Sequence, residues 1–127
     1  MNCELHILVA EDNPIIRQAL ILQLRQLGHD PLQAVDGLHA FDLFTQRQFA
    51  LILMDVNMPN CSGIDATILI RDYEKKHDLA RTPIVAVTAL PETRQECFAS
   101  GMDDFIIKPL LFERLRQLVD RWLPVHS

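Results

Sequence analysis

The chain has 127 residues, of which 49% are hydrophobic and 23% are charged. This balance is typical of one folded domain with its own core, and it excludes an intrinsically disordered chain. The formal net charge of −5 argues against binding to nucleic acid or contact with an anionic membrane surface.

Short apolar runs alternate with segments of helical pattern along the chain. The runs have the length and continuity of buried strands, and the segments between them repeat apolar residues at helical spacing. In chain order, the pattern predicts strand 5–10, helix 15–27, strand 30–35, helix 37–46, strand 49–55, helix 63–77, strand 83–89, helix 91–100, strand 104–108 and helix 111–123. Asn13 and Pro14 suit the start of the first helix, and Gly28 suits its end.

Five strand–helix units with nearly continuous apolar strands predict an α/β fold with helices on both faces of a parallel sheet. At this length the natural candidate is a single-domain (βα)5 flavodoxin-like, doubly wound sheet of strand order 2-1-3-4-5 over residues 1–127. We expect no membrane span and no signal peptide, because no apolar stretch is long enough and acidic residues follow closely on the first one. Cys3, Cys61 and Cys97 lack metal-ligand spacing, which predicts free thiols in the cytoplasm.

Four of the predicted strands lead directly into polar residues. Glu11 and Asp12 follow the first strand, Asp55 ends the third, Thr88 lies at the end of the fourth, and Lys108 ends the fifth. The carboxyl ends of parallel strands share one edge of the sheet, and ligands bind there beside the switch point between the first and third strands. We therefore expect these five side chains to meet in one crevice.

Three carboxylates in one crevice repel one another and favour a bound cation. Oxygen ligands suit Mg²⁺ (or Mn²⁺), and no Cys/His cluster indicates zinc. A carboxylate such as Asp55 can act as the nucleophile in phosphoryl transfer, with the metal and Lys108 holding the transferred group and the Thr88 hydroxyl bonded to it. A single Asp at a strand end is more often a turn or cap residue, so the hypothesis depends on the joint placement.

Four motifs then resemble a known family. The segments "AEDNP", "LILMDVNMPNCSG", "PIVAVTA" and "GMDDFIIKPL" follow one another as in the response-regulator receiver domain of two-component signalling, and the resemblance covers essentially the whole chain. It implies an acidic pocket, a metal site, a phosphoacceptor, its partners and a switch aromatic. The implied residues are Glu11, Asp12 and Asp55 in the pocket, Asp12, Asp55 and the Asn57 carbonyl as Mg²⁺ ligands, Asp55 as phosphoacceptor, Lys108 as phosphate partner, Thr88 as switch hydroxyl and Phe105 as switch aromatic.

The segment "MPNCSGIDATILIR" most resembles receivers attached to hybrid sensor histidine kinases, which usually read MPxMDGxEATxxIR. This implies a phosphohistidine donor on a histidine kinase or a histidine-phosphotransfer domain, and a parent chain that is a histidine kinase. The domain would then be cytoplasmic, and a membrane anchor elsewhere in the parent kinase stays an open alternative. The domain itself would be a self-catalysed phosphoacceptor and not an enzyme. A stand-alone response regulator is the alternative. Departures from the usual pattern are Cys61-Ser62, Ile16-Arg17 and Phe105 in place of the common tyrosine.

The first predicted helix carries more apolar residues than one core stripe requires. Ile16, Leu20, Leu24 and Leu27 share one face at helical spacing, while Ile15, Ala19 and Leu22 lie on another. We expect the second set to contact a phosphotransfer helix beside the crevice. The alternative is that these are scattered exposed apolar residues, which are normal on protein surfaces.

Three other classes fit the sequence less well. An Asp-nucleophile phosphohydrolase would need a second Asp two residues after the first, and here Asn57 follows Asp55. A flavodoxin-like cofactor binder would need a Ser/Thr/Gly-rich loop in place of "EDNP". A calcium loop counted from Asp55 would put Pro59 at a ligand position and Ala66 at the closing glutamate.

Overall fold

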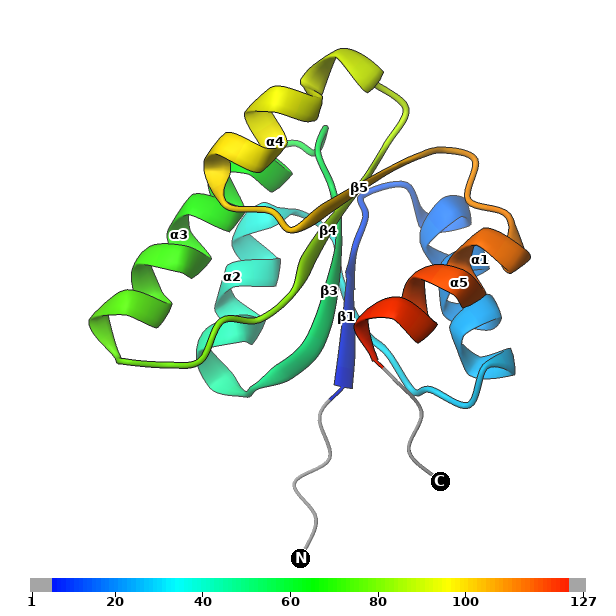
Figure 1. Ribbon diagram of the computed structural model, residues 1–127, viewed down its shortest axis with the longest axis horizontal. Coiled ribbons are helices and arrows are strands. Elements are labelled where there is room, and N and C mark those ends of the chain that lie inside the picture. Colours follow the sequence, from blue (N-terminus) through cyan, green and yellow to red (C-terminus); the bar gives the residue numbers. More distant parts are fainter. Residues whose placement is uncertain (1–5, 124–127) are drawn as a thin grey trace, which may run out of the picture.

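The computed structural model describes residues 6–123, which form five parallel strands and five α-helices (Figure 1). The strands are β1 (His6–Ala10), β2 (Leu32–Ala34), β3 (Phe49–Asp55), β4 (Ile84–Thr88) and β5 (Asp104–Ile107). The helices are α1 (Pro14–Gln26), α2 (Gly37–Gln46), α3 (Gly63–Lys76), α4 (Arg94–Ser100) and α5 (Phe112–Trp122), with a 3-10 turn η1 (Pro91–Thr93) before α4. The strand order β2-β1-β3-β4-β5 confirms the predicted topology.

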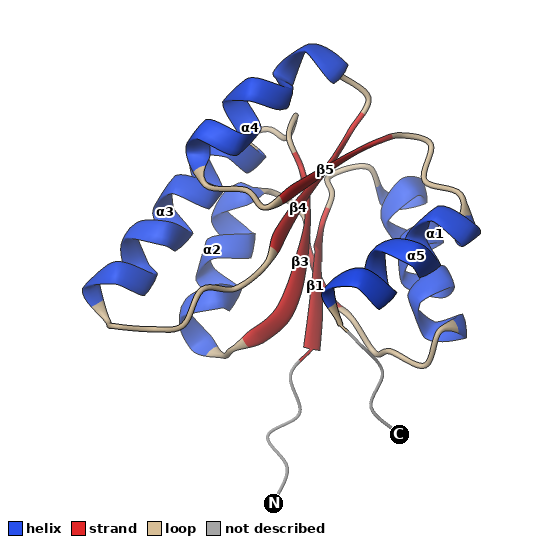
Figure 2. Ribbon diagram, in the orientation of Figure 1, coloured by secondary structure: helices blue, strands red, loops and turns tan. Residues whose placement is uncertain are grey.

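The sheet lies between two helical layers, with α1 and α5 on one face and α2, α3 and α4 on the other (Figure 2). Each face has its own core of buried apolar side chains. Every residue of β3 and β4 except Ala50 is buried, as expected for central strands covered on both faces. None of the described helices is long and apolar enough to cross a membrane.

Side-chain caps explain where the first three helices begin. The Asn13 side chain accepts hydrogen bonds from the backbone N–H groups of Ile15 and Ile16 at 2.9 and 3.1 Å, as its predicted role requires. Asp36 and Ser62 cap α2 and α3 in the same way. Asn13 therefore ends the polar loop that follows β1, and Ser62 ends the polar loop that follows β3.

Several predicted boundaries change. Strand 30–35 contracts to β2, because only Leu32–Ala34 pair with β1 at the edge of the sheet. Predicted helix 91–100 begins as the 3-10 turn η1 and becomes α-helical only at Arg94. In α1, the buried residues are Leu20, Ile21 and Leu24. Ile21 was not part of the face that the sequence predicted to be buried. Cys61 and Cys97 are buried free thiols, and Cys3 lies outside the described residues.

Candidate functional site

The register of the sheet aligns the carboxyl ends of four strands. Ala10 of β1 lies opposite Met54 of β3, so the Glu11 that follows lies level with Asp55. Met54 also pairs with Ala86 of β4, so Asp55 lies level with the residue that follows Ala86. The predicted gathering of polar residues at this edge is therefore present, and it lines a crevice of about 280 Å³.

Three carboxylates meet in the crevice. Glu11, Asp12 and Asp55 can each place one oxygen within 4.8 Å of the other two. Glu11 and Asp55 are buried, with 2% and 5% of their surfaces exposed, whereas Asp12 is exposed. Two buried carboxylates and one at the mouth form a strongly negative pocket that opens to solvent on one side.

Lys108 supplies the positive charge of the crevice. Its Nζ lies 2.7 Å from Glu11 Oε1 and 3.3 Å from Asp55 Oδ2. Burial raises the pKa of the Glu11 carboxyl above its ordinary value, although the Lys108 ammonium and the Asn13 N–H oppose this effect. Burial alone would lower the pKa of Lys108, but the Glu11 and Asp55 carboxylates outweigh it and the pKa is raised. Lys108 is therefore a fixed cation next to Asp55.

Thr88 and Phe105 complete the predicted set. Thr88 is buried at the end of β4 and lines the crevice. Its hydroxyl oxygen accepts a hydrogen bond from Leu90 N–H at 3.1 Å, which leaves the hydroxyl hydrogen free to bond an oxygen in the crevice. Phe105 is half-buried on the edge strand β5 and packs against the core beneath α4. It does not line the crevice.

The loop after β1 is held by contacts that sequence reasoning missed. Arg17 Nη1 donates to the carbonyl oxygens of Glu11 and Asp12 at 2.9 and 3.4 Å, and Arg17 Nε bonds Gln33 Oε1 at 3.0 Å. Asn13 N–H donates to Glu11 Oε2 at 3.1 Å. No local motif signals the Arg17 contacts, since they join α1 to β2 through the folded loop.

The loop after β3 depends on a close approach at Gly63. Gly63 N–H donates to Val56 O at 2.9 Å, at the point where the chain turns into α3. A Cβ at position 63 would overlap the backbone carbonyl oxygen of Asp55 and lie 2.8 Å from Met54 Cγ. Only glycine fits here without displacing the end of β3.

The donor set of the crevice fits a hard divalent cation. Asp12, Asp55 and Asn57 all line the crevice, and Asp12 and Asp55 can place carboxylate oxygens within 4.8 Å of each other. No His or Cys is among the described residues that line the crevice, so its ligands are those of Mg²⁺ or Mn²⁺ and not of zinc.

A family model described as the response regulator receiver domain matches residues 7–120. The chain belongs to the response-regulator receiver family. Its strand order is the one that the sequence predicted for a phosphorelay receiver in two-component signalling.

The curated relatives are much longer proteins, and this chain matches a part of each. It is 38% identical over 124 residues to hybrid signal transduction histidine kinase F of Dictyostelium discoideum, covering 95% of this chain and 11% of that protein. It is 40% identical over 118 residues to the sensor histidine kinase RcsC of Salmonella typhi, covering 91% of this chain and 12% of that protein. The receiver thus spans about a tenth of the length of either relative.

Two solved receivers are similar in structure. The receiver domain of the sensor histidine kinase PA1611 from Pseudomonas aeruginosa, with magnesium coordinated in its active-site cleft, has a TM-score of 0.85 and 33% identity, covering 97% of this chain and 100% of that one. The receiver of Ssk1 from Saccharomyces cerevisiae, in complex with the histidine phosphotransfer protein Ypd1, has a TM-score of 0.87 and 30% identity. The match covers 94% of this chain and 88% of that one.

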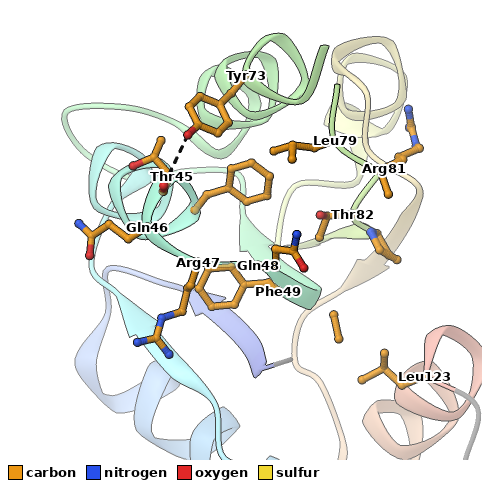
Figure 3. Close-up of a pocket in the computed structure, with 14 residues that line it drawn as sticks. Thr45, Gln46, Arg47, Gln48, Phe49, Tyr73, Leu79, Arg81, Thr82 and Leu123 are labelled. Atoms are coloured by element: carbon orange, nitrogen blue, oxygen red, sulfur yellow. Dashed lines mark hydrogen bonds between the residues drawn. The ribbon is translucent and has the colours of Figure 1, made fainter. Parts of the chain in front are cut away.

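A larger cleft, of about 510 Å³, lies at the opposite, amino end of the sheet (Figure 3). Arg47, Tyr73 and Leu79 are among its lining residues, and Tyr73 hydroxyl donates to Thr45 O at 3.5 Å. None of its described lining residues carries a carboxylate, a thiol or an imidazole. The carboxylates that the sequence singled out, Glu11, Asp12 and Asp55, line the smaller crevice at the carboxyl ends of the strands and not this cleft.

Proposed function

We propose that this receiver takes up a phosphoryl group on Asp55 from a phosphohistidine donor. The observation that carries the proposal is the surroundings of Asp55, which is buried at the end of β3, 3.3 Å from the Lys108 ammonium and beside two further carboxylates. An aspartate that serves as a turn or cap residue bonds backbone N–H groups, and that role requires neither a neighbouring lysine nor two further carboxylates. This environment suits a carboxylate that must hold a dianionic group.

The transfer would proceed by in-line displacement. One Asp55 carboxylate oxygen attacks the phosphorus, the P–N bond to the donor imidazole breaks, and the imidazole nitrogen leaves with the bonding electron pair. The acyl phosphate remains on Asp55. Lys108 lies close enough to turn from the carboxylate to an oxygen of the new group, and the Thr88 hydroxyl can donate to another.

We further propose that Asp12, Asp55 and the Asn57 carbonyl hold Mg²⁺ (or Mn²⁺) in the crevice. When bound, this ion neutralises charge on the phosphoryl oxygens and on the carboxylates. Glu11 has a different part in the acidic pocket. Its two oxygens face Lys108 and Asn13 N–H, so it orients the ammonium and the start of the loop.

Incubation of the protein with acetyl phosphate or phosphoramidate tests the chemistry and its metal requirement. With Mg²⁺ present, intact mass spectrometry is expected to show one phosphate-sized gain. Chelation of the metal is expected to reduce the rate of adduct formation by about 100-fold or more, because three carboxylates then repel the incoming dianion. An equal rate without metal would reject the metal proposal, and no adduct under any condition would reject the function.

The context of the receiver is a second part of the proposal. Residues 1–127 would form the receiver domain of a hybrid sensor histidine kinase, with a kinase or histidine-phosphotransfer domain as donor. The support is that relatives such as kinase F and RcsC carry similar segments within far longer chains. This domain would then act as a phosphoacceptor, while histidine kinase activity would belong to another part of the parent chain. A stand-alone regulator would use the same crevice.

The donor is proposed to dock on the first helix. Ile15, Ala19 and Leu22 of α1 are all exposed, Ile15 by 80% and Leu22 by 52%. Ile15 lies in the first turn of α1, directly after the loop that carries Asp12, so a helix packed along this face would present its phosphohistidine to the crevice.

Leu22→Glu is expected to slow transfer from the cognate phosphohistidine donor by about 10- to 100-fold, because it places a charge in an apolar contact. Phosphorylation by acetyl phosphate is expected to stay at the wild-type rate. Stopped-flow or quench measurements of transfer check both. Ile68→Glu on α3 is a matched control, since Ile68 is 51% exposed on the other side of the sheet. Equal effects of the two substitutions, or equal loss with both donors, would contradict the docking proposal.

A further inference from the structure

The Arg17 side chain of α1 holds the backbone on both sides of Asp12. Its Nη1 donates to the carbonyl oxygen of Glu11 at 2.9 Å and to the carbonyl oxygen of Asp12 at 3.4 Å. These two carbonyls belong to the peptide planes that flank the Asp12 Cα. Because the orientations of the two planes set φ and ψ of Asp12, one guanidinium nitrogen restricts the direction in which the Asp12 side chain leaves the backbone.

The Asp12 carboxylate depends on this backbone for its placement. The Glu11 carboxylate is buried and has contacts of its own, with Lys108 Nζ at 2.7 Å and Asn13 N–H at 3.1 Å. Asp12 is exposed at the mouth of the crevice, and within residues 6–123 its carboxylate makes no hydrogen bond or ion pair. What directs this carboxylate is therefore the conformation of the loop.

The loop and Arg17 are both tied to β2. Arg17 Nε donates to Gln33 Oε1 of β2 at 3.0 Å. The start of the loop is fixed to the same strand, since Glu11 N–H donates to Ala34 O at 3.0 Å. Arg17 thus connects α1, β2 and the backbone around Asp12, and it holds the loop against two regular elements.

The charge of Arg17 by itself would act against a bound cation. The guanidinium is always protonated in a protein, and it would repel a divalent ion held by the neighbouring Asp12. A positioning role and a purely electrostatic role therefore predict opposite results. Loss of Arg17 weakens metal binding if the residue orients Asp12, and strengthens it if the residue acts through its charge alone.

We propose that Arg17 is a positioning residue of the metal site, which orients Asp12 to ligate Mg²⁺. The inference rests on the proposed function, in which Asp12, Asp55 and the Asn57 carbonyl hold the ion, and it adds the residue that prepares the exposed ligand. Arg17 does not line the crevice, so it acts through Asp12. Without Arg17, the loop must be ordered when the ion binds, which weakens binding but leaves the reaction at saturating Mg²⁺ unchanged.

The test is titration of the protein with Mg²⁺ in the absence of a phosphodonor, followed by backbone amide chemical shifts. Arg17→Met keeps an unbranched apolar stem and removes every donor, so packing is largely preserved. It is expected to raise the dissociation constant of Mg²⁺ by about tenfold, the lower end of the range for residues that orient metal ligands. Gln33→Ala removes the partner of Arg17 Nε without a change of charge and is expected to raise the constant by about twofold.

Arg25→Met is the matched control. It removes another arginine of α1, whose side chain is 52% exposed and pairs with Asp30 at 4.0 Å, and it is expected to leave the dissociation constant unchanged. In the acetyl phosphate reaction, Arg17→Met is expected to raise the half-saturating Mg²⁺ concentration by the same factor as the dissociation constant. The maximal rate is expected to stay at the wild-type value, which general damage to the fold would lower.

An Arg17→Met protein that binds Mg²⁺ as tightly as wild type, or more tightly, would overturn the inference. Equal weakening by Arg25→Met would do the same, because it would assign the effect to α1 in general. If urea unfolding shows that Arg17→Met does not fold, Gln33→Ala decides, and a wild-type constant in that variant counts against the inference. A wild-type protein that binds no Mg²⁺ would overturn the proposed metal site as well, so the wild-type titration separates the two failures.

Discussion

Asp55→Asn is expected to abolish phosphoryl uptake from both small phosphodonors and a phosphohistidine donor. The amide has nearly the shape of the carboxylate, but its oxygen carries no full negative charge and is not an adequate nucleophile. Intact mass after incubation with acetyl phosphate and Mg²⁺ is expected to show no adduct. The fold is expected to persist, because the substitution removes one of three mutually repelling carboxylates in the crevice.

Asp30→Asn is the matched control for that substitution. The Asp30 side chain is 82% exposed and forms a 4.0 Å ion pair with Arg25, so its replacement is expected to leave uptake at the wild-type level. A full adduct on the Asp55→Asn protein would show that another residue is the phosphoacceptor. Peptide mapping of the wild-type adduct would then identify that residue.

Gly63→Ala is expected to lower the free energy of unfolding by about 3 kcal/mol, near the upper end of the cost of overpacking a buried site. The added Cβ would overlap the Asp55 carbonyl oxygen, so either α3 or the end of β3 must move. Phosphorylation of the folded protein is expected to slow by about tenfold or more, since the displaced backbone carries the nucleophile. Urea unfolding and the acetyl phosphate reaction measure the two effects.

Gly28→Ala separates steric overlap from the general cost of replacing a glycine. A Cβ on Gly28 meets no atom within 4 Å, but the positive φ of 92° costs an alanine about 1 kcal/mol. This variant is expected to lose stability modestly and to react with acetyl phosphate at the wild-type rate. If Gly63→Ala were no worse than Gly28→Ala in both measurements, the close approach to Asp55 would have no functional weight.

Much of the fold followed from local patterns. The predicted ranges 37–46 and 49–55 coincide with α2 and β3, because each has a strong pattern and clear polar boundaries. The weaker range 30–35 was too long, since strand length at a sheet edge depends on how much of the neighbouring strand remains to pair. The turn η1 was missed because the pattern of 91–100 does not distinguish a 3-10 start from an α-helical one.

The sequence by itself determined the strand–helix alternation and the polar residues at the carboxyl ends of the strands. In a parallel sheet those two properties are enough to bring Asp55, Thr88 and Lys108 to one edge. The tertiary structure alone decided which groups touch: Lys108 lies closer to Glu11 than to Asp55, Gly63 closes under the end of β3, and Arg17 bonds the carbonyl oxygens of the loop after β1. Such contacts join segments far apart in the chain, and no local pattern encodes the distance between them.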